Sequence, residues 1–119
     1  MSEAREMVKK IYHALKEKKA DDITVIDITE VSCLADYFII TNGENNNQVQ
    51  AMADSVDEAM TRAGHTARGI EGYSAANWIL LDYGDVVVHI FSKDDRRFYD
   101  LERIWRDGNH MDADELKAN

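Results

Sequence analysis

The chain of 119 residues is predicted to form a single α/β domain, with a mixed sheet of about five strands and three helices. Segments with helical periodicity alternate with short apolar runs, as is typical of α/β proteins. Two of these runs flank a short turn that contains glycine, which favours an antiparallel hairpin within the sheet. Hydrophobic residues make up 45% of the chain and charged residues 31%, a balance typical of folded globular domains.

The first half of the chain is expected to form a helix, two strands and a second helix. Residues 3–19 have an apolar stripe, with acids near the start and lysines near the end, as the helix dipole favours. Residues 23–28 and 37–41 are rich in β-branched and aromatic side chains and are expected to be strands. Residues 45–63 contain a second apolar stripe and are expected to form the second helix, and Gly64 after them is a natural helix stop.

The second half is expected to add three extended segments and a third helix. Residues 66–70 form a short extended piece, and residues 78–81 and 86–91 form the hairpin. Residues 93–106 have the spacing of the third helix. The domain is expected to cover residues 1–107. Residues 108–119 are polar and are expected to form a disordered tail.

Both alternating sets of side chains in the hairpin strands are largely apolar, so both faces of the sheet are expected to be covered. Three helices cover two faces of a five-stranded sheet only thinly. Two interpretations therefore stay open: helices lie on both faces, or a second protein chain covers part of one face.

The charge is strongly asymmetric. The net charge is -9 and the isoelectric point is near 4.8. Residues 21–61 contain nine acids and no lysine or arginine, whereas residues 1–20 are basic. An acidic surface repels phosphate backbones, so DNA binding and extensive RNA contact are disfavoured. A basic protein is the better candidate partner.

The sequence indicates a cytoplasmic protein without a membrane span. The single cysteine, Cys33, excludes an intramolecular disulfide. The first residues lead into a charged helix rather than an apolar signal segment, and no apolar run is long enough to cross a bilayer.

No pattern of side chains predicts a metal or cofactor site. The candidate ligands do not have the spacing of known metal motifs; they are His13, Cys33, His65, His89 and His110. His89 lies inside an apolar strand and is expected to be a hydrogen-bonded strand histidine. We therefore expect no resident cofactor and no metal.

Two further patterns bear on nucleotide chemistry. Residues 41–44 join a strand to a helix, where a phosphate can bind, but the turn has one glycine and the acid Glu44. The candidate acids for a Mg²⁺-dependent enzyme are Asp27, Asp82 and Asp85, and none forms a D-x-D pair at a strand end. Asp82 and Asp85 are expected to be turn residues. An enzyme of nucleotidyltransferase type therefore remains only the alternative hypothesis.

Two long strings are specific enough to suggest a family. They are WILLDYGDVVVHIF at residues 78–91 and RFYDLERIW at residues 97–105. Shorter strings precede them in the same order: DITEVS from Asp27, ADYFIIT from Ala35, QVQAMAD from Gln48 and EG from Glu71. On these strings the chain closely resembles the ribosomal silencing factor RsfS family, also called Iojap or YbeB, from about residue 5 to Trp105.

The resemblance implies a nucleotidyltransferase-like fold without catalytic carboxylates, and therefore no enzymatic activity. It implies binding to ribosomal protein L fourteen on the large subunit, which blocks joining of the small subunit and represses translation in starvation or stationary phase. Some family members also act in large-subunit maturation. The resemblance further implies a homodimer when the protein is free.

The candidate partner-binding site is the hairpin. Trp78 matches the family tryptophan that is implicated in the ribosomal-protein contact, and Leu80, Asp82 and Tyr83 extend this site to its neighbours. Sequence pattern alone leaves open whether Trp78 is an interface residue or a core residue. Glu44 and the two asparagines after it depart from the Ser/Thr-rich family pattern, which weakens any anion site at that helix start.

Overall fold

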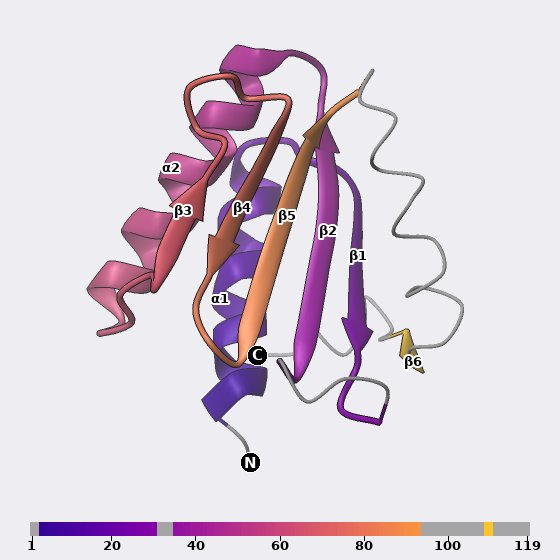
Figure 1. Ribbon diagram of the computed structural model, residues 1–119, viewed down its shortest axis with the longest axis vertical. Helices are drawn as coiled ribbons and strands as arrows, with labels where there is room; N and C mark the ends of the chain where they lie inside the picture. Colours follow the sequence, from indigo (N-terminus) through magenta and orange to yellow (C-terminus); the bar gives the residue numbers. More distant parts are fainter. Residues whose placement is uncertain (1–2, 31–34, 94–108, 111–119) are drawn as a thin grey trace.

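The computed structural model describes residues 3–30, 35–93 and 109–110 (Figure 1). Its elements follow in the order α1 (Glu3–Glu17), β1 (Asp21–Asp27), β2 (Tyr37–Gly43), α2 (Asn46–Arg62), β3 (Gly69–Glu71), β4 (Trp78–Asp82), β5 (Val86–Ser92) and β6 (Asn109–His110). The predicted third helix falls outside the described residues except for its first residue, Lys93, which forms a turn after β5. No helix in these ranges is long and apolar enough to span a membrane.

The strands form one mixed sheet in the order β3-β4-β5-β2-β1-β6. β2 and β5 run parallel, and every other neighbouring pair is antiparallel. The predicted mixed α/β sheet is confirmed, and so is the β4–β5 hairpin, in which Trp78 lies opposite Phe91. Within the segment expected to be a disordered tail, Asn109 and His110 form β6 and pair with β1.

α1 forms because its apolar residues recur with helical spacing and can be buried together. The predicted stripe, at positions 7, 8, 11, 14 and 15, is confirmed. Ala4 and Tyr12 widen it, so that the buried residues are Ala4, Met7, Val8, Ile11, Tyr12, Ala14 and Leu15. The helix ends two residues earlier than predicted, because Lys19 adopts a left-handed conformation with φ of 59°. The Ala20 N–H then donates to the Leu15 carbonyl and closes the end of the helix.

Side chains and glycine fix the two ends of α2. The Asn45 side chain accepts a hydrogen bond from the Gln48 N–H at 2.9 Å, so Asn45 is the N-cap of the helix. Gly64, with φ of 89°, follows the C-cap, as the sequence predicts for a stop residue. The predicted apolar stripe from Val49 to Met60 is buried.

Both described helices lie on the same face of the sheet, behind the strands in Figure 1. The main core forms between this face and the helices, where Ile39, Leu81 and Val88 of the strands pack with Ile11 and Val56. A smaller buried cluster lies on the other side of the sheet. We call that side, which neither α1 nor α2 covers, the second face.

Candidate docking surface on the second face of the sheet

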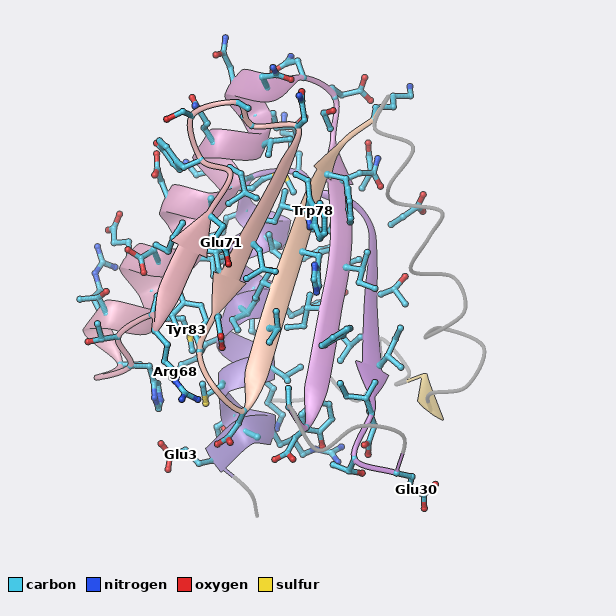
Figure 2. The ribbon with its side chains drawn as sticks, in the orientation of Figure 1. Glu3, Glu30, Arg68, Glu71, Trp78 and Tyr83 are labelled. Atoms are coloured by element: carbon cyan, nitrogen blue, oxygen red, sulfur yellow. The ribbon has the colours of Figure 1, made fainter. Side chains whose placement is uncertain are left out.

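Strand alternation sends alternate residues of β4 to opposite faces of the sheet. Ile79 and Leu81 are fully buried in the main core under the helices. Trp78, Leu80 and Asp82 therefore point to the second face, and all three are half-buried. Figure 2 shows the Trp78 side chain in front of the strands, on the side of the sheet away from the helices.

The second face is largely aromatic at its centre. The Trp78 ring stacks on Phe91, with ring centroids 5.3 Å apart and planes 15° apart. It also stacks on His89 at 5.9 Å, and Phe38 of β2 meets the other side of His89 edge-on at 4.9 Å. Three neighbouring strands thus contribute one ring cluster, in which His89 and Phe91 are buried and Phe38 and Trp78 are only partly buried.

Trp78 is neither fully exposed nor fully buried. Its indole N–H donates to Nδ1 of His89 at 3.1 Å, and its ring packs against the smaller buried cluster that contains Ile40 and Phe91. A half-buried tryptophan with a satisfied polar tip is typical of residues that anchor protein interfaces. Trp78 therefore differs in exposure from the fully buried side chains that it packs against.

His89 is the expected hydrogen-bonded strand histidine, and the bond from Trp78 confirms this. Its side chain is 4% exposed, and burial lowers its pKa to about 4, so the ring is neutral at pH 7. Within the described residues, its buried Nε2 has no hydrogen-bond partner. A polar ring in an otherwise apolar cluster is unusual and calls for a physical reason.

Leu80 and two acids lie beside the aromatic cluster. Leu80 pairs with His89 on one side and with Glu71 of the edge strand β3 on the other. Glu71, labelled in Figure 2, is exposed, and Asp82 is half-buried. The apolar centre therefore has carboxylates toward the β3 edge, an arrangement that favours a basic partner.

The structure does not bring Tyr83 together with the rest of the predicted site. Tyr83 is buried on the helix side, and its hydroxyl donates to Oδ1 of Asp57 in α2 at 3.0 Å. Burial and this hydrogen bond raise the Tyr83 pKa above its usual value. Strand alternation could have separated Tyr83 from Trp78, because the two positions differ by an odd number of residues.

Three residues of the second face were not included in the predicted site. They are Phe38, His89 and Phe91, which lie at alternate positions of β2 and β5. Strand alternation in β5 shows that residues 87, 89 and 91 share a face. It does not show which face carries the site, because both faces of β5 are apolar. Phe38 could not be added from sequence, because the pairing of β2 with β5 joins segments far apart in the chain.

The candidate acids for metal chemistry are engaged in turns. Oδ1 of Asp27 accepts from the Thr29 N–H at 3.0 Å and from the Thr29 hydroxyl at 2.7 Å. Oδ1 of Asp82 accepts from the Gly84 N–H at 2.8 Å, which confirms its predicted role in the hairpin turn. Among the residues that the structure describes, no group of three or more His, Cys, Asp or Glu side chains could hold a metal ion.

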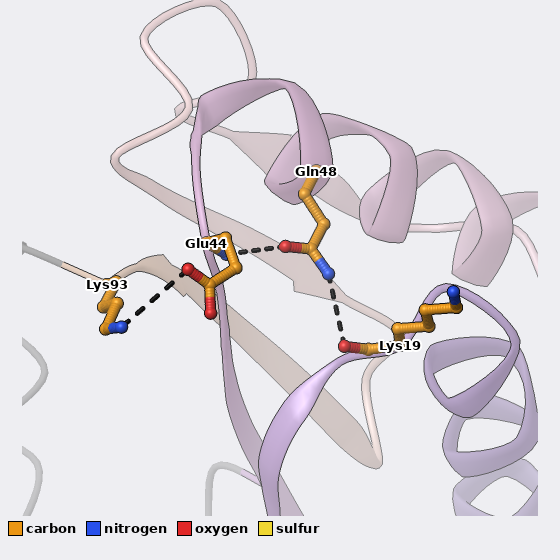
Figure 3. Close-up of polar contacts among 4 residues, drawn as sticks. All are labelled: Lys19, Glu44, Gln48 and Lys93. Atoms are coloured by element: carbon orange, nitrogen blue, oxygen red, sulfur yellow. Dashed lines mark hydrogen bonds and ion pairs between the residues drawn. The ribbon is translucent and has the colours of Figure 1, made fainter.

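The start of α2 is bonded to its own neighbours (Figure 3). Oε1 of Gln48 accepts from the Glu44 N–H at 2.6 Å, and Nε2 of Gln48 donates to the carbonyls of Lys18 and Lys19. The Glu44 carboxylate lies 3.8 Å from Nζ of Lys93. Gln48 thus ties the α1–β1 corner to the β2–α2 turn, and the carboxylate of Glu44 disfavours a phosphate there.

A groove of about 700 Å³ lies between α1 and α2, on the opposite side of the molecule from Trp78. Its rim carries charges of both signs, including Lys10 and Glu17 of α1 and Asp54 of α2. Glu58 and Arg62 form an ion pair along this rim. The arrangement is that of a solvated helix–helix surface rather than of converging catalytic groups.

Comparison with known proteins gives a consistent result. The family model for RsfS, the ribosomal silencing factor during starvation, matches residues 1–119. A ribosomal silencing factor RsfS of Bacillus subtilis is 42% identical over 101 residues, covering 85% of this chain and 86% of the relative. One of Halalkalibacterium halodurans is 38% identical over 103 residues, covering 87% and 88%. A mouse relative named mitochondrial assembly of ribosomal large subunit protein 1 is 30% identical over 95 residues, which are 76% of this chain and 41% of that protein.

Solved structures agree in fold. A crystal structure from Bacillus halodurans has a TM-score of 0.82 at 34% identity and covers 90% of this chain and 97% of that one. A crystal structure of a protein from Chromobacterium violaceum has a TM-score of 0.83 at 36% identity and covers 88% of each chain.

Proposed function

The chain belongs to the ribosomal silencing factor family, and we propose that it binds ribosomal protein L fourteen on the large ribosomal subunit through its second face. One observation carries this assignment of the surface. Trp78 is half-buried, stacked on Phe91 and held at its polar tip, with Leu80 beside it. A rigid aromatic side chain of this kind loses little entropy on binding and can supply much of the binding energy.

The charge pattern supports a protein partner rather than bare RNA. The chain has a net charge of -9, and the acids Glu71 and Asp82 lie next to the apolar centre of the second face. A basic ribosomal protein is attracted to such a rim, whereas RNA phosphates are repelled.

The functional consequence is steric. A domain bound to ribosomal protein L fourteen beside the subunit interface prevents the small subunit from joining, without any catalysis. Translation is thereby repressed during starvation or in stationary phase, in keeping with the name of the matching family. The name of the mouse relative supports a further role in assembly of the large subunit.

The free protein is proposed to be a cytoplasmic homodimer. Phe38, Trp78 and Val87 are apolar and only partly buried on the second face, so a second copy of the chain can cover them. If the dimer and the ribosomal protein use the same surface, ribosomal protein L fourteen will convert the dimer into a heterodimer. Light scattering of the free chain and of the mixture measures both states.

The decisive experiment combines subunit joining and binding. Added protein is expected to reduce the joined-ribosome peak in a sucrose gradient of mixed Bacillus subtilis subunits. Trp78→Ala is expected to bind large subunits at least about 30-fold more weakly, because truncation of an interface hot spot costs at least about 2 kcal/mol. The same variant should lose the inhibition of joining.

A matched control tests whether the loss is specific to the second face. Ile70 is a large apolar side chain, 43% exposed, and its register with Leu81 places it on the side of the sheet that faces the helices. Ile70→Ala should leave both binding and inhibition unchanged. If Trp78→Ala co-sediments with large subunits as well as the unaltered protein does, the docking surface has been assigned wrongly. If the unaltered protein does not inhibit joining even in excess, the silencing proposal is wrong.

A further inference from the structure

His89 lies at the centre of the aromatic cluster on the second face. Its ring is stacked near-parallel to that of Phe91, with centroids 6.4 Å apart, and to that of Trp78, with centroids 5.9 Å apart. It contacts Phe38 edge-on from the other side. The side chain is 4% exposed, so partner proteins cannot reach much of it directly.

The hydrogen bond from Trp78 fixes the protonation state of this ring. An indole N–H can only donate, so Nδ1 of His89 must be the acceptor and the ring proton must be on Nε2. Burial of the ring favours this neutral form. Nε2 is itself buried and has no hydrogen-bond partner within the described residues.

An apolar ring at position 89 would fill the same space and would have no Nε2 donor, the buried atom that lacks a partner among the described residues. Among the residues that the structure describes, the imidazole makes one hydrogen bond, and it is to the indole of Trp78. The physical reason for a histidine here is therefore its effect on Trp78 rather than the packing of the cluster.

We propose that His89 is a positioning residue, whose Nδ1 holds the indole of Trp78 in the one orientation that meets the partner protein. A half-buried tryptophan at a sheet surface has several allowed rotamers, and a directional acceptor selects one of them before binding. Selection in the free protein lowers the entropy lost on association. The effect on binding rests on the proposed function, whereas the fixing of the indole does not depend on it.

Two substitutions separate the acceptor from the ring. His89→Phe keeps an aromatic ring for stacking but has no acceptor. His89→Asn removes the ring but keeps an oxygen near the place of Nδ1. If His89 acts only by packing, His89→Phe should resemble the unaltered protein and His89→Asn should be the more disturbed of the two.

The first readout is NMR of the free protein. The indole N–H resonance of Trp78, assigned with a Trp78→Phe variant, should shift in His89→Phe, and its proton should exchange with water about tenfold faster. In His89→Asn both should stay closer to their original values. An unchanged indole resonance and exchange rate in His89→Phe would overturn the inference.

The second readout is binding to Bacillus subtilis large subunits. His89→Phe should bind about three- to tenfold more weakly, the size expected for loss of one net hydrogen bond, and His89→Asn should bind more tightly than His89→Phe. If Trp78→Ala weakens binding but His89→Phe does not, the effect of His89 on binding is refuted. If Trp78→Ala has no effect, the docking proposal fails, and the NMR result alone decides the positioning role.

A third measurement keeps the inference testable if His89→Phe does not fold. The ¹⁵N shifts of the His89 ring in the unaltered protein report which nitrogen carries the proton. A proton on Nε2 is expected, and a proton on Nδ1 would exclude the hydrogen bond and with it the proposal.

Discussion

Lowering the pH from 7 to 5 is expected to destabilise the domain through His89. The ring is buried in its neutral form, and burial lowers its pKa from 6.5 to about 4. Between these two values the unfolded chain binds a proton that the folded chain does not bind. The stability that depends on neutral His89 is therefore fully present above about pH 6.5 and is lost as the pH falls toward 4.

The size of the effect follows from the two pKa values. A shift from 6.5 to about 4 corresponds to about 3 kcal/mol over the whole window, at about 1.4 kcal/mol for each pKa unit. Because pH 5 lies within the window, the loss between pH 7 and pH 5 is about 2 kcal/mol. That is a large fraction of the stability of a small domain.

Urea unfolding at pH 7 and pH 5, at one protein concentration, measures the effect. The concentration is kept fixed because a dimer is stabilised by mass action. His89→Phe is the control: position 89 cannot titrate in this variant, so the difference between its two unfolding free energies reports all other groups. The unaltered protein should lose about 2 kcal/mol more than this variant. Equal losses in the two proteins would refute the burial argument for His89.

Four further substitutions test other parts of the structure. Gly72→Ala should lower the free energy of unfolding by about 3 kcal/mol, because φ is 79° and a Cβ would lie 2.1 Å from the carbonyl oxygen of Trp78. Gly64→Ala should cost only about 1 kcal/mol, since nothing lies within 4 Å of a Cβ there. Asn45→Ala should remove the cap of α2 and cost about 1 kcal/mol in thermal or urea unfolding. Tyr83→Phe should cost about 1 kcal/mol through its lost hydrogen bond to α2 but leave binding to large subunits unchanged.

The outcomes that would contradict these predictions are specific. Equal losses for the two glycine variants would mean that the close approach to Trp78 does not restrict position 72. An unchanged stability of Asn45→Ala would mean that solvent replaces the cap at no cost. Weakened subunit binding by Tyr83→Phe, at unchanged stability, would place Tyr83 in the docking surface after all.

Most helices and strands of the described fold could be predicted from local sequence. The stripe of α2 from Val49 to Met60 and its stop at Gly64 follow from spacing and side-chain chemistry, whereas Asn45 was expected inside the helix and is its N-cap. The β4–β5 hairpin follows from two apolar runs around a short turn. These features need only residues that are near each other in the chain, which is why the sequence indicates them directly.

The candidate site could be predicted only in part. The strings around residues 78–91 pointed to Trp78, and alternation placed Leu80 and Asp82 beside it. Tyr83 was grouped with them because it is close in sequence, although its register places it on the helix side. Neighbours in a strand share a face only at even spacing.

The amino-acid sequence was sufficient to predict the α/β class, the stop of α2 at Gly64, the hairpin and the family. The three-dimensional packing was needed to show that α1 and α2 lie on one face of the sheet, which leaves Trp78 on the other face. It also decided that β2 runs parallel to β5 and brings Phe38 beside His89, and that His89 accepts the hydrogen bond of Trp78. The reason is physical: apolar patterns show that a face is buried, but only the packing of distant segments determines what buries it.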